Sequence, residues 1–329
     1  MTTAKLAIRW VASPKSSGQP ANMACVSTEI VVAFGVDVNY APHLAVAIAS
    51  VVANAPGALF RFMIIHDGVP AAHQSQVEAV ASGHAFEWHE IADSRLLEME
   101  SFNHITRASY FRFAIPTFTP ADAKRVIYLD CDLVVLGDLR DLAKVDLQGN
   151  GIGAVYDAAV DSEAFRTRWG SAPKRLSYFN SGVLVLDIEK IRSAGGFEPA
   201  IETLKRYREK CIFGDQCALN VMMQDRWTPI PPIWNVQRRM VMKEGTPCYL
   251  TSEEMQAGLR PGIIHFTETN KPWASDGYHP YVWTYYKYLR RTPYWRSVNA
   301  KAKTTIIQHI RRYVKTAFNL ARLKKRASQ

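Results

Sequence analysis

The chain has 329 residues, 48% hydrophobic and 21% charged, with a formal net charge of +10. This composition fits a globular protein with one large α/β domain or two small ones, and it excludes wholly disordered, collagen-like and disulfide-framework proteins. No apolar run approaches the length of about 18 residues that a membrane-spanning helix needs.

Positive charge is concentrated at the carboxyl-terminal end of the chain. Asp276 is the last acidic residue, and thirteen Lys or Arg residues follow it. Removing these thirteen from the 40 basic residues leaves 27 against 30 acidic ones, so residues 1–276 carry about −3. This distribution argues against a nucleic-acid-binding core and favours a tail that is attracted to an anionic surface.

The amino-terminal segment and the cysteines indicate the compartment. Five cysteines, an odd number without a Cys-x-x-Cys pair, are typical of a reduced, cytoplasmic protein. Residues 5–12 are too short for a signal peptide and are interrupted by Arg9. Residues 1–28 are therefore predicted to be a disordered extension, and Met1 or Met23 is the start of the protein.

Short β-branched runs alternate with helical patterns up to residue 266, as expected of strands buried on both faces. The predicted strands are residues 30–36, 60–66, 85–91, 125–129, 151–156, 182–186 and 263–266. The predicted helices are residues 43–52, 71–81, 109–114, 188–193, 198–208, 214–224, 278–291 and 304–326. The alternation predicts an α/β domain with a mainly parallel sheet and helices on both of its faces.

The helix predicted over residues 304–326 is basic and amphipathic. Its apolar face holds Ile307, Ile310, Val314, Phe318 and Ala321, whereas Leu323 falls outside this stripe. Its basic face holds Arg311, Arg312, Lys315 and Arg322. Such a helix suits an anionic membrane surface, so residues 300–326 are predicted to attach the protein to the inner face of the plasma membrane. A helix packed on the domain, or a disordered end, is the alternative.

Polar residues follow several predicted strands at once. Asp37 and Asn39 follow the first strand, Asp130 and Asp132 follow residues 125–129, and Asp157 follows residues 151–156. The carboxyl edge of an open parallel sheet is where ligands bind, so a ligand site is predicted there.

The pair Asp130 and Asp132 could hold Mn²⁺ or Mg²⁺ and leave positions for the oxygens of a diphosphate. A solvated turn is the alternative. His265 ends the last predicted strand, and as a third ligand it would favour Mn²⁺; otherwise it is a core histidine.

Other residues are candidates for phosphate and sugar contacts. Lys271 could clamp a phosphate, or lie exposed beside Trp273. Arg107 or Arg112 could bind phosphate or pair with an acid, Arg112 being the better candidate. Two pairs of polar residues are candidates for contacts with the sugar. Asn180 and Ser181 precede the strand predicted at 182–186, and Asp215 and Gln216 lie at the start of the helix predicted at 214–224. Their alternative roles are turn residues and, for Asp215, a helix cap.

Four sequence blocks occur in an order that resembles the family-8 glycosyltransferases, especially bacterial lipooligosaccharide and lipopolysaccharide galactosyl- and glucosyltransferases. They are VVAFGVDVNY (31–40), VIYLDCDLVVLGDL (126–139), YFNSGVLVLDI (178–188) with FGDQCALN (213–220), and IIHFTETNKPW (263–273). The resemblance implies a GT-A fold over residues 29–275, a UDP-galactose or UDP-glucose donor, Mn²⁺, retention at the anomeric carbon and a glycan or lipid-linked acceptor. Residues 276–329 would then be the aromatic and basic attachment region.

The resemblance also implies residue roles. The metal ligands would be Asp130, Asp132 and His265. Uracil and ribose would lie against Gly35, Asp37 and Asn39, and Lys271 would contact the diphosphate. The donor sugar would be surrounded by Arg112, Asp157, Asn180, Ser181, Asp215 and Gln216.

Three positions depart from the family pattern: Val38, Cys217 and Glu268. A carboxylate at position 268 would disfavour a diphosphate unless it turns outward. For the chemistry, Gln216 resembles the residue opposite the anomeric carbon, and its amide dipole favours attack on the same face as the leaving group. A covalent intermediate on Asp215 is the rival mechanism.

Two other functions share some of these features. A sugar-nucleotide nucleotidyltransferase would have the sheet and the metal aspartates, but it usually carries a basic, Gly-rich loop after the first strand, where this chain has GVDVNYAPH. A non-catalytic protein tethered to a membrane would not need Asp132, His265 and Lys271 together.

Overall fold

The computed structural model describes residues 29–99, 106–170, 178–224, 226–242, 251–274, 277–302 and 305–327. The extension predicted at residues 1–28, with both possible start sites, lies outside the described residues.

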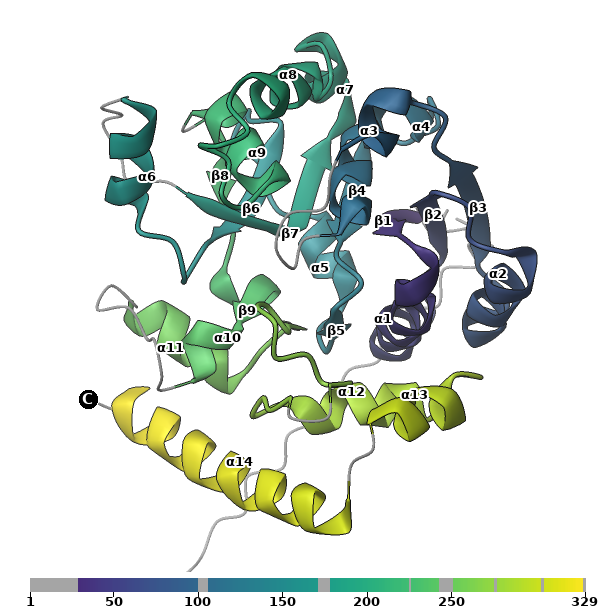
Figure 1. The fold of residues 1–329 in the computed structure, drawn as a ribbon, viewed down its shortest axis with the longest axis vertical. Helices are drawn as coiled ribbons and strands as arrows, with labels where there is room; N and C mark the ends of the chain where they lie inside the picture. Colours follow the sequence, from purple (N-terminus) through teal and green to yellow (C-terminus); the bar gives the residue numbers. More distant parts are fainter. Residues whose placement is uncertain are drawn as a thin grey trace, which may run out of the picture.

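A seven-stranded sheet runs through the centre of the molecule in the order β3-β2-β1-β4-β7-β6-β8 (Figure 1). Its strands are β1 (Ile30–Val36), β2 (Phe60–His66), β3 (Ala85–Glu90), β4 (Arg125–Leu129), β6 (Ile152–Tyr156), β7 (Phe179–Asp187) and β8 (Thr228–Pro229). All neighbouring pairs are parallel except those of β7, which runs antiparallel to β4 and to β6. The sheet is therefore mostly parallel, as the sequence predicts.

The reversed direction of β7 matters for the site. Because β7 runs against its neighbours, its amino-terminal end lies at the edge where β4 and β6 end. Asn180 and Ser181, the second and third residues of β7, thus lie at the same edge as Asp130 and Asp157.

Helices cover both faces of the sheet and complete a mixed α/β fold. They are α1 (Ala41–Asn54), α2 (Ala71–Glu78), α3 (Ser94–Leu97), α4 (Ile115–Phe118), α5 (Leu139–Ala143), α6 (Ser162–Trp169), α7 (Ile188–Ser193), α8 (Glu198–Arg206), α9 (Asp215–Met223), α10 (Arg238–Val241), α11 (Ser252–Leu259), α12 (Val282–Leu289), α13 (Trp295–Ala302) and α14 (Ile306–Ala327). Short 3₁₀ helices are η1 (Val38–Tyr40), η2 (Ala79–Ala81), η3 (Arg107–Ala114) and η4 (Pro232–Asn235).

Alternate residues of the strands enter two separate cores. Val32 and Phe34 of β1 pack with α1 and α12, whereas Val31 and Ala33 pack with η3 on the opposite face. This arrangement explains the continuous apolar runs of the strands, since both of their faces are buried. The helix predicted at 109–114 is the 3₁₀ helix η3, which runs directly into α4, and Pro116 lies in the first turn of α4, where its missing N–H costs nothing.

A second, three-stranded sheet lies beside the main one in the order β5-β10-β9. Its strands are β5 (Leu133–Val135), β9 (Val236–Gln237) and β10 (Ile263–His265). The last strand predicted from the sequence therefore belongs to this small sheet and not to the main one. β10 pairs antiparallel with β5, which places His265 opposite Leu133, the residue after Asp132.

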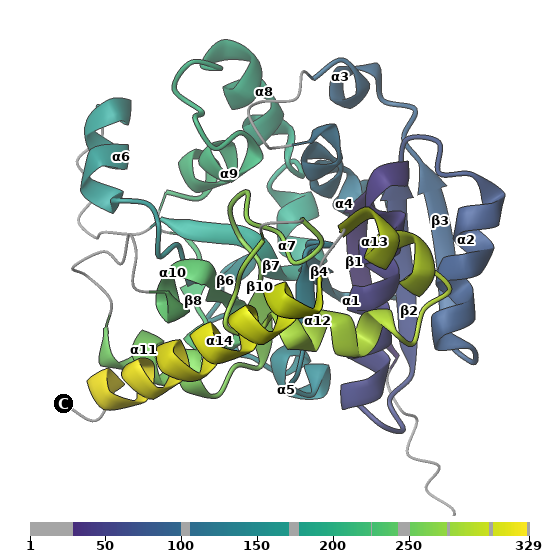
Figure 2. The same cartoon turned by 60° about the horizontal axis from the view of Figure 1, so that its bottom comes forward.

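The helices after residue 277 pack on the domain (Figures 1 and 2). Buried aromatic residues of α12, among them Tyr285 and Tyr288, belong to the same core as α1. α14 lies along the bottom of Figure 1 and packs on α11 through Leu323, which is 6% exposed. No helix in the described part of the chain combines the length and apolar character needed to cross a bilayer.

Candidate active site

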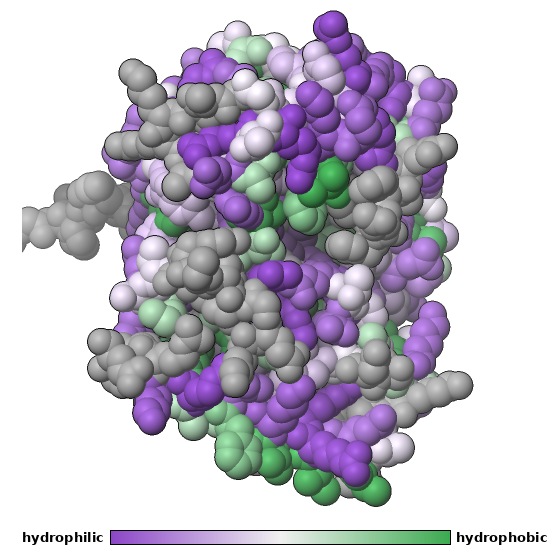
Figure 3. Space-filling model, turned by 60° about the vertical axis from the view of Figure 1, so that its left-hand side comes forward, coloured by the Kyte–Doolittle hydropathy of each residue, from purple (hydrophilic) through white to green (hydrophobic). Residues whose placement is uncertain are grey.

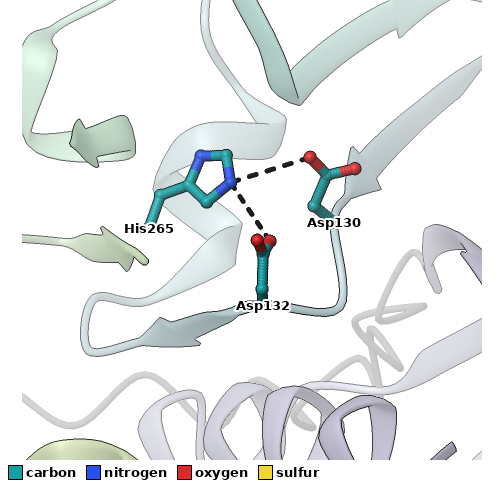
Figure 4. A group of neighbouring side chains, drawn as sticks. All are labelled: Asp130, Asp132 and His265. Atoms are coloured by element: carbon teal, nitrogen blue, oxygen red, sulfur yellow. Dashed lines mark ion pairs between the residues drawn. The ribbon is translucent and has the colours of Figure 1, made fainter. Parts of the chain in front are cut away.

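Asp130, Asp132 and His265 converge at the carboxyl edge of the sheet (Figure 4). Both aspartates lie in the turn between β4 and β5, and His265 reaches them from β10. His265 Nε2 lies 3.1 Å from Asp132 Oδ1 and 3.7 Å from Asp130 Oδ2. One ligand atom from each residue lies within 4.8 Å of the others, which is a geometry that one ion can bridge.

A residue that the sequence did not single out orients the histidine. Asn235, fully buried at the end of η4, has its Oδ1 3.0 Å from His265 Nδ1, and its Nδ2 donates to Asn180 Oδ1. When Asn235 Oδ1 accepts a hydrogen bond from the Nδ1–H of His265, the Nε2 atom of His265 is unprotonated. Its lone pair then points toward the two aspartates. Metal-binding histidines are usually fixed in this way. No local pattern marks Asn235, because its partners are 30 and 55 residues away.

The surroundings fit a divalent cation. Asp132 Oδ1 is buried and accepts no hydrogen bond, whereas Oδ2 of the same carboxylate accepts from Lys271, so Oδ1 is the oxygen left without a donor. Burial disfavours ionisation of Asp132, but Lys271 and His265 outweigh it and hold its pKa well below the usual range. Two carboxylates and one imidazole are a donor set that can hold a divalent metal ion.

Glycine is required where β7 passes this cluster. A Cβ on Gly182 would lie 2.2 Å from His265 Cε1 and 2.7 Å from Asp130 Oδ2. The backbone of β7 therefore forms one wall of the cluster, and a side chain at this position would displace His265 or Asp130.

Arg112 lies almost completely buried between two carboxylates. It donates to Asp130 Oδ1 at 2.9 Å, and its Nε lies 3.1 Å from Asp215 Oδ2. It also donates to Ser181 O and stacks on the ring of Tyr128. Burial favours loss of its proton, but the two carboxylates prevail and raise its pKa above the ordinary value. Arg112 thus holds the two acids in place.

Asp215 does not cap α9, so that alternative from the sequence was wrong. The cap position is Gly214, at φ 52°, and the Asp215 side chain instead turns into the cleft. There it accepts from Ser181 Oγ at 3.2 Å and pairs with Arg112. Burial raises its pKa, although Arg112 opposes the shift.

Gln216 and Asp157 are joined at the opposite wall of the cleft. Gln216 Oε1 accepts from Ser181 N at 3.0 Å, and Gln216 Nε2 donates to Asp157 Oδ2 at 3.0 Å. Asp157 Oδ2 also accepts from Asn180 Nδ2, and Asp157 Oδ1 accepts two backbone N–H groups of the following turn. Asp157 therefore fixes the amides of Asn180 and Gln216.

Lys271 closes the cleft from the loop after β10. Its Nζ donates to Asp132 Oδ2 at 2.5 Å and to Phe266 O at 2.7 Å. Trp273, two residues on, stacks on His43 of α1 with ring centroids 3.5 Å apart. Burial lowers the pKa of His43 to about 3, so its imidazole is uncharged at neutral pH. The stacked rings therefore anchor the loop through an apolar contact.

Glu268, in the same loop, adopts a left-handed backbone with φ 69°. Its carboxylate pairs with Arg238 at 3.4 Å and with Arg239 at 2.9 Å. Its negative charge is thus balanced by two arginines.

The cleft has a volume of about 400 Å³ and collects eleven of the thirteen residues to which the resemblance assigns roles, while Arg107, the other phosphate candidate, lines a neighbouring cavity. They are Gly35, Arg112, Asp130, Asp132, Asp157, Asn180, Ser181, Asp215, Gln216, His265 and Lys271. Asp37 and Asn39 line a neighbouring cavity that shares Thr106 and Ala108 with the cleft. Asp37 Oδ1 accepts from Asn39 N and Tyr40 N and so shapes the turn after β1.

Comparison with solved structures identifies the fold. The galactosyltransferase LgtC, in complex with donor and acceptor sugar analogues, superposes with a TM-score of 0.71 at 24% identity, over 82% of this chain and 100% of that chain. The bifunctional glycosyltransferase WbbM gives a TM-score of 0.68 at 21% identity, over 85% of this chain and 52% of that chain. Together with the mostly parallel sheet, this likeness defines a GT-A fold, the fold of a class of glycosyltransferases.

Sequence comparison identifies the family. The profile described as "Glycosyl transferase family 8" matches residues 31–277, and the chain belongs to this family. General stress protein A of Bacillus subtilis (strain 168) is 30% identical over 81% of this chain and 94% of its own. Lipopolysaccharide 1,2-glucosyltransferase of Escherichia coli (strain K12) is 27% identical over 86% and 83% of the two chains. The protein is therefore a glycosyltransferase.

Proposed function

We propose that the protein transfers galactose or glucose from its UDP conjugate to a hydroxyl of a glycan acceptor, with retention at the anomeric carbon and dependence on Mn²⁺. The convergence of Asp130, Asp132 and His265 supports this proposal most directly. The acceptor class is inferred from relatives named as lipopolysaccharide glucosyl- and galactosyltransferases. We therefore infer that the acceptor is a lipooligosaccharide or lipopolysaccharide core.

Each part of the cleft has a place in this reaction. Asp130, Asp132 and His265 would hold the cation, which neutralises the negative charge of the departing diphosphate as a Lewis acid. Lys271, whose ammonium group contacts Asp132, is positioned to bind a diphosphate oxygen. Gly35, Asp37 and Asn39 would surround the nucleoside, since they line the cleft and its neighbouring cavity.

The contacts of Gln216 and Asp215 favour attack on the face from which the diphosphate leaves. Asp215 is engaged by Arg112 and by Ser181 Oγ, which reduces its nucleophilicity. Gln216 is fixed by Asp157 and Ser181, so the dipole of its amide can stabilise a cationic sugar without reorganisation. The leaving diphosphate would accept the proton of the acceptor hydroxyl.

Release of UDP tests the proposal. With Mn²⁺, slow hydrolysis of UDP-galactose or of UDP-glucose is expected, and EDTA should stop it. The donor that is hydrolysed faster identifies the sugar that the enzyme transfers. Failure of both donors, together with the absence of metal-dependent UDP binding in calorimetry, would reject the proposed donor class.

We also propose that the protein works in the cytoplasm, attached to the inner face of the plasma membrane through residues 300–326. The apolar stripe of α14 (Ile307, Ile310, Val314 and Phe318) faces away from the domain. Ile307 is 64% and Phe318 is 73% exposed, and Figure 3 shows apolar residues along the lower edge of the molecule, where α14 lies. Leu323, outside the stripe, packs inward together with Leu320, which is partly buried against the same core.

Membrane binding should depend on the stripe. The variant Ile310→Ser with Phe318→Ser is expected to lose at least about tenfold in partitioning to vesicles with anionic lipid, because two side chains worth about 1.5–3 kcal/mol each no longer enter the bilayer. Co-sedimentation measures this loss. Ala321→Ser, on the same face, is the control for a small change. Unchanged sedimentation of the double variant would refute attachment through the stripe.

A further inference from the structure

A large groove separates α14 from α12 and α13, and it is remote from the catalytic cleft. Its volume is about 1190 Å³, and it shares no lining residue with the cleft. One wall comes from α14, through Ile310, Tyr313 and Leu320. The other comes from α12 and α13, through Trp283 and Trp295. The groove lining is thus mainly apolar and aromatic, and Asn299, Arg312 and Thr316 also belong to it.

Three cations lie on one side of this groove. Lys287, Arg290 and Arg291 are exposed and belong to the last turn of α12 and the residues after it. Arg290 lies over the ring of Trp295, and Arg291 lies over the ring of Tyr288. In the described ranges no carboxylate pairs with any of the three, and no acidic residue follows Asp276 in the sequence. Their charge is available to an external anion.

The groove opens toward the proposed membrane face. Ile310 belongs both to the groove wall and to the apolar stripe of α14. Trp283, on the other wall, is 53% exposed, and tryptophan is enriched at the level of lipid headgroups. An amphiphile could therefore pass from a bilayer into the groove without crossing water.

We propose that this groove binds one anionic phospholipid, with an acyl chain between the aromatic walls and the phosphate at Lys287, Arg290 and Arg291. The three cations favour a lipid whose headgroup has a net negative charge over one whose phosphate is balanced by a cation in the headgroup. The apolar walls favour a ligand with an acyl chain over inorganic phosphate. This site deepens the proposed membrane attachment: the stripe places the protein on the bilayer, and the groove recognises a lipid within it.

Titration of the full chain with monomeric short-chain lipids tests the proposal. Saturable calorimetric binding of dihexanoyl-phosphatidylglycerol is expected, at least about tenfold tighter than that of dihexanoyl-phosphatidylcholine. Arg290→Ala with Arg291→Ala should weaken it about 30-fold, the effect of two cations worth about 1 kcal/mol each near an anionic lipid. Arg311→Ala with Arg322→Ala removes the same charge outside the groove and should retain the affinity.

Three results would overturn the site. They are the absence of saturable binding, equal loss of affinity in the two double variants, and inorganic phosphate that competes as strongly as the lipid. UDP release by the same proteins, without lipid, separates this failure from that of the proposed enzymatic function. If the chain hydrolyses the donor but binds no lipid, the groove proposal is rejected and the proposed enzymatic function stands.

Discussion

Asp132→Asn is expected to lower sugar transfer at least about 100-fold, because the amide replaces a charged ligand at the centre of the site. Asp132 contacts His265 at 3.1 Å and Lys271 at 2.5 Å, so no other described carboxylate can take its place between them. A direct readout is thermal stability. A ligand at 100 times its Kd stabilises the native state by about 2.7 kcal/mol, and Mn²⁺ with UDP should raise the Tm of the natural chain but not of the variant.

Asp138→Asn is the matched control. Asp138 is also an aspartate with a lowered pKa, through its bonds to Arg140, but it caps α5 away from the cleft. Because asparagine caps a helix about as well as aspartate, its substitution is expected to change stability little and to leave transfer unchanged. A normal Mn²⁺ response in Asp132→Asn would show that the cluster is not the metal site.

Gly182→Ala is expected to disable the site although it replaces no polar side chain. The added methyl would lie 2.2 Å from His265 Cε1, and the ring cannot retreat, since it is 3% exposed and bonded to Asn235. Either His265 or β7 must shift, at a cost of about 1–3 kcal/mol. Transfer should fall at least about 100-fold, with loss of the Mn²⁺-dependent rise in Tm.

Gly151→Ala distinguishes a local effect from a general intolerance of alanine. A Cβ at Gly151 would meet Ile191 Cγ1 at 3.4 Å, an ordinary contact, and would lie before β6. This variant should fold and transfer sugar like the natural chain. If Gly182→Ala binds Mn²⁺ with natural affinity, the tight contact between β7 and His265 is not needed for the site.

The sequence by itself predicted every strand of the main sheet except β8, and it predicted that Asp130 and Asp132 lie together at the end of β4. Runs such as residues 125–129 are apolar and rich in β-branched residues because both faces of the strand are covered, and their shortness and polar flanks indicate a strand and not a helix. Asp130 and Asp132 follow that run directly, and the carboxyl edge of a parallel sheet is where a ligand can approach. Family membership, carried by four ordered blocks, is likewise a property of the sequence.

Only the tertiary structure decided what these residues contact. The antiparallel course of β7 brings Asn180 and Ser181 to the edge, and the pairing of β10 with β5 brings His265 to Asp132. The roles of Arg112 and Asn235 also depend on partners distant in sequence.

The same holds for α14. The spacing of apolar residues along α14 predicts an apolar stripe. The domain, however, packs on the face that carries Leu323 and leaves the stripe exposed. Local sequence sets the period of an element, because neighbouring side chains and the backbone share one geometry. Which strand pairs with which, and which face of a helix is covered, depends on long-range packing that no local pattern encodes.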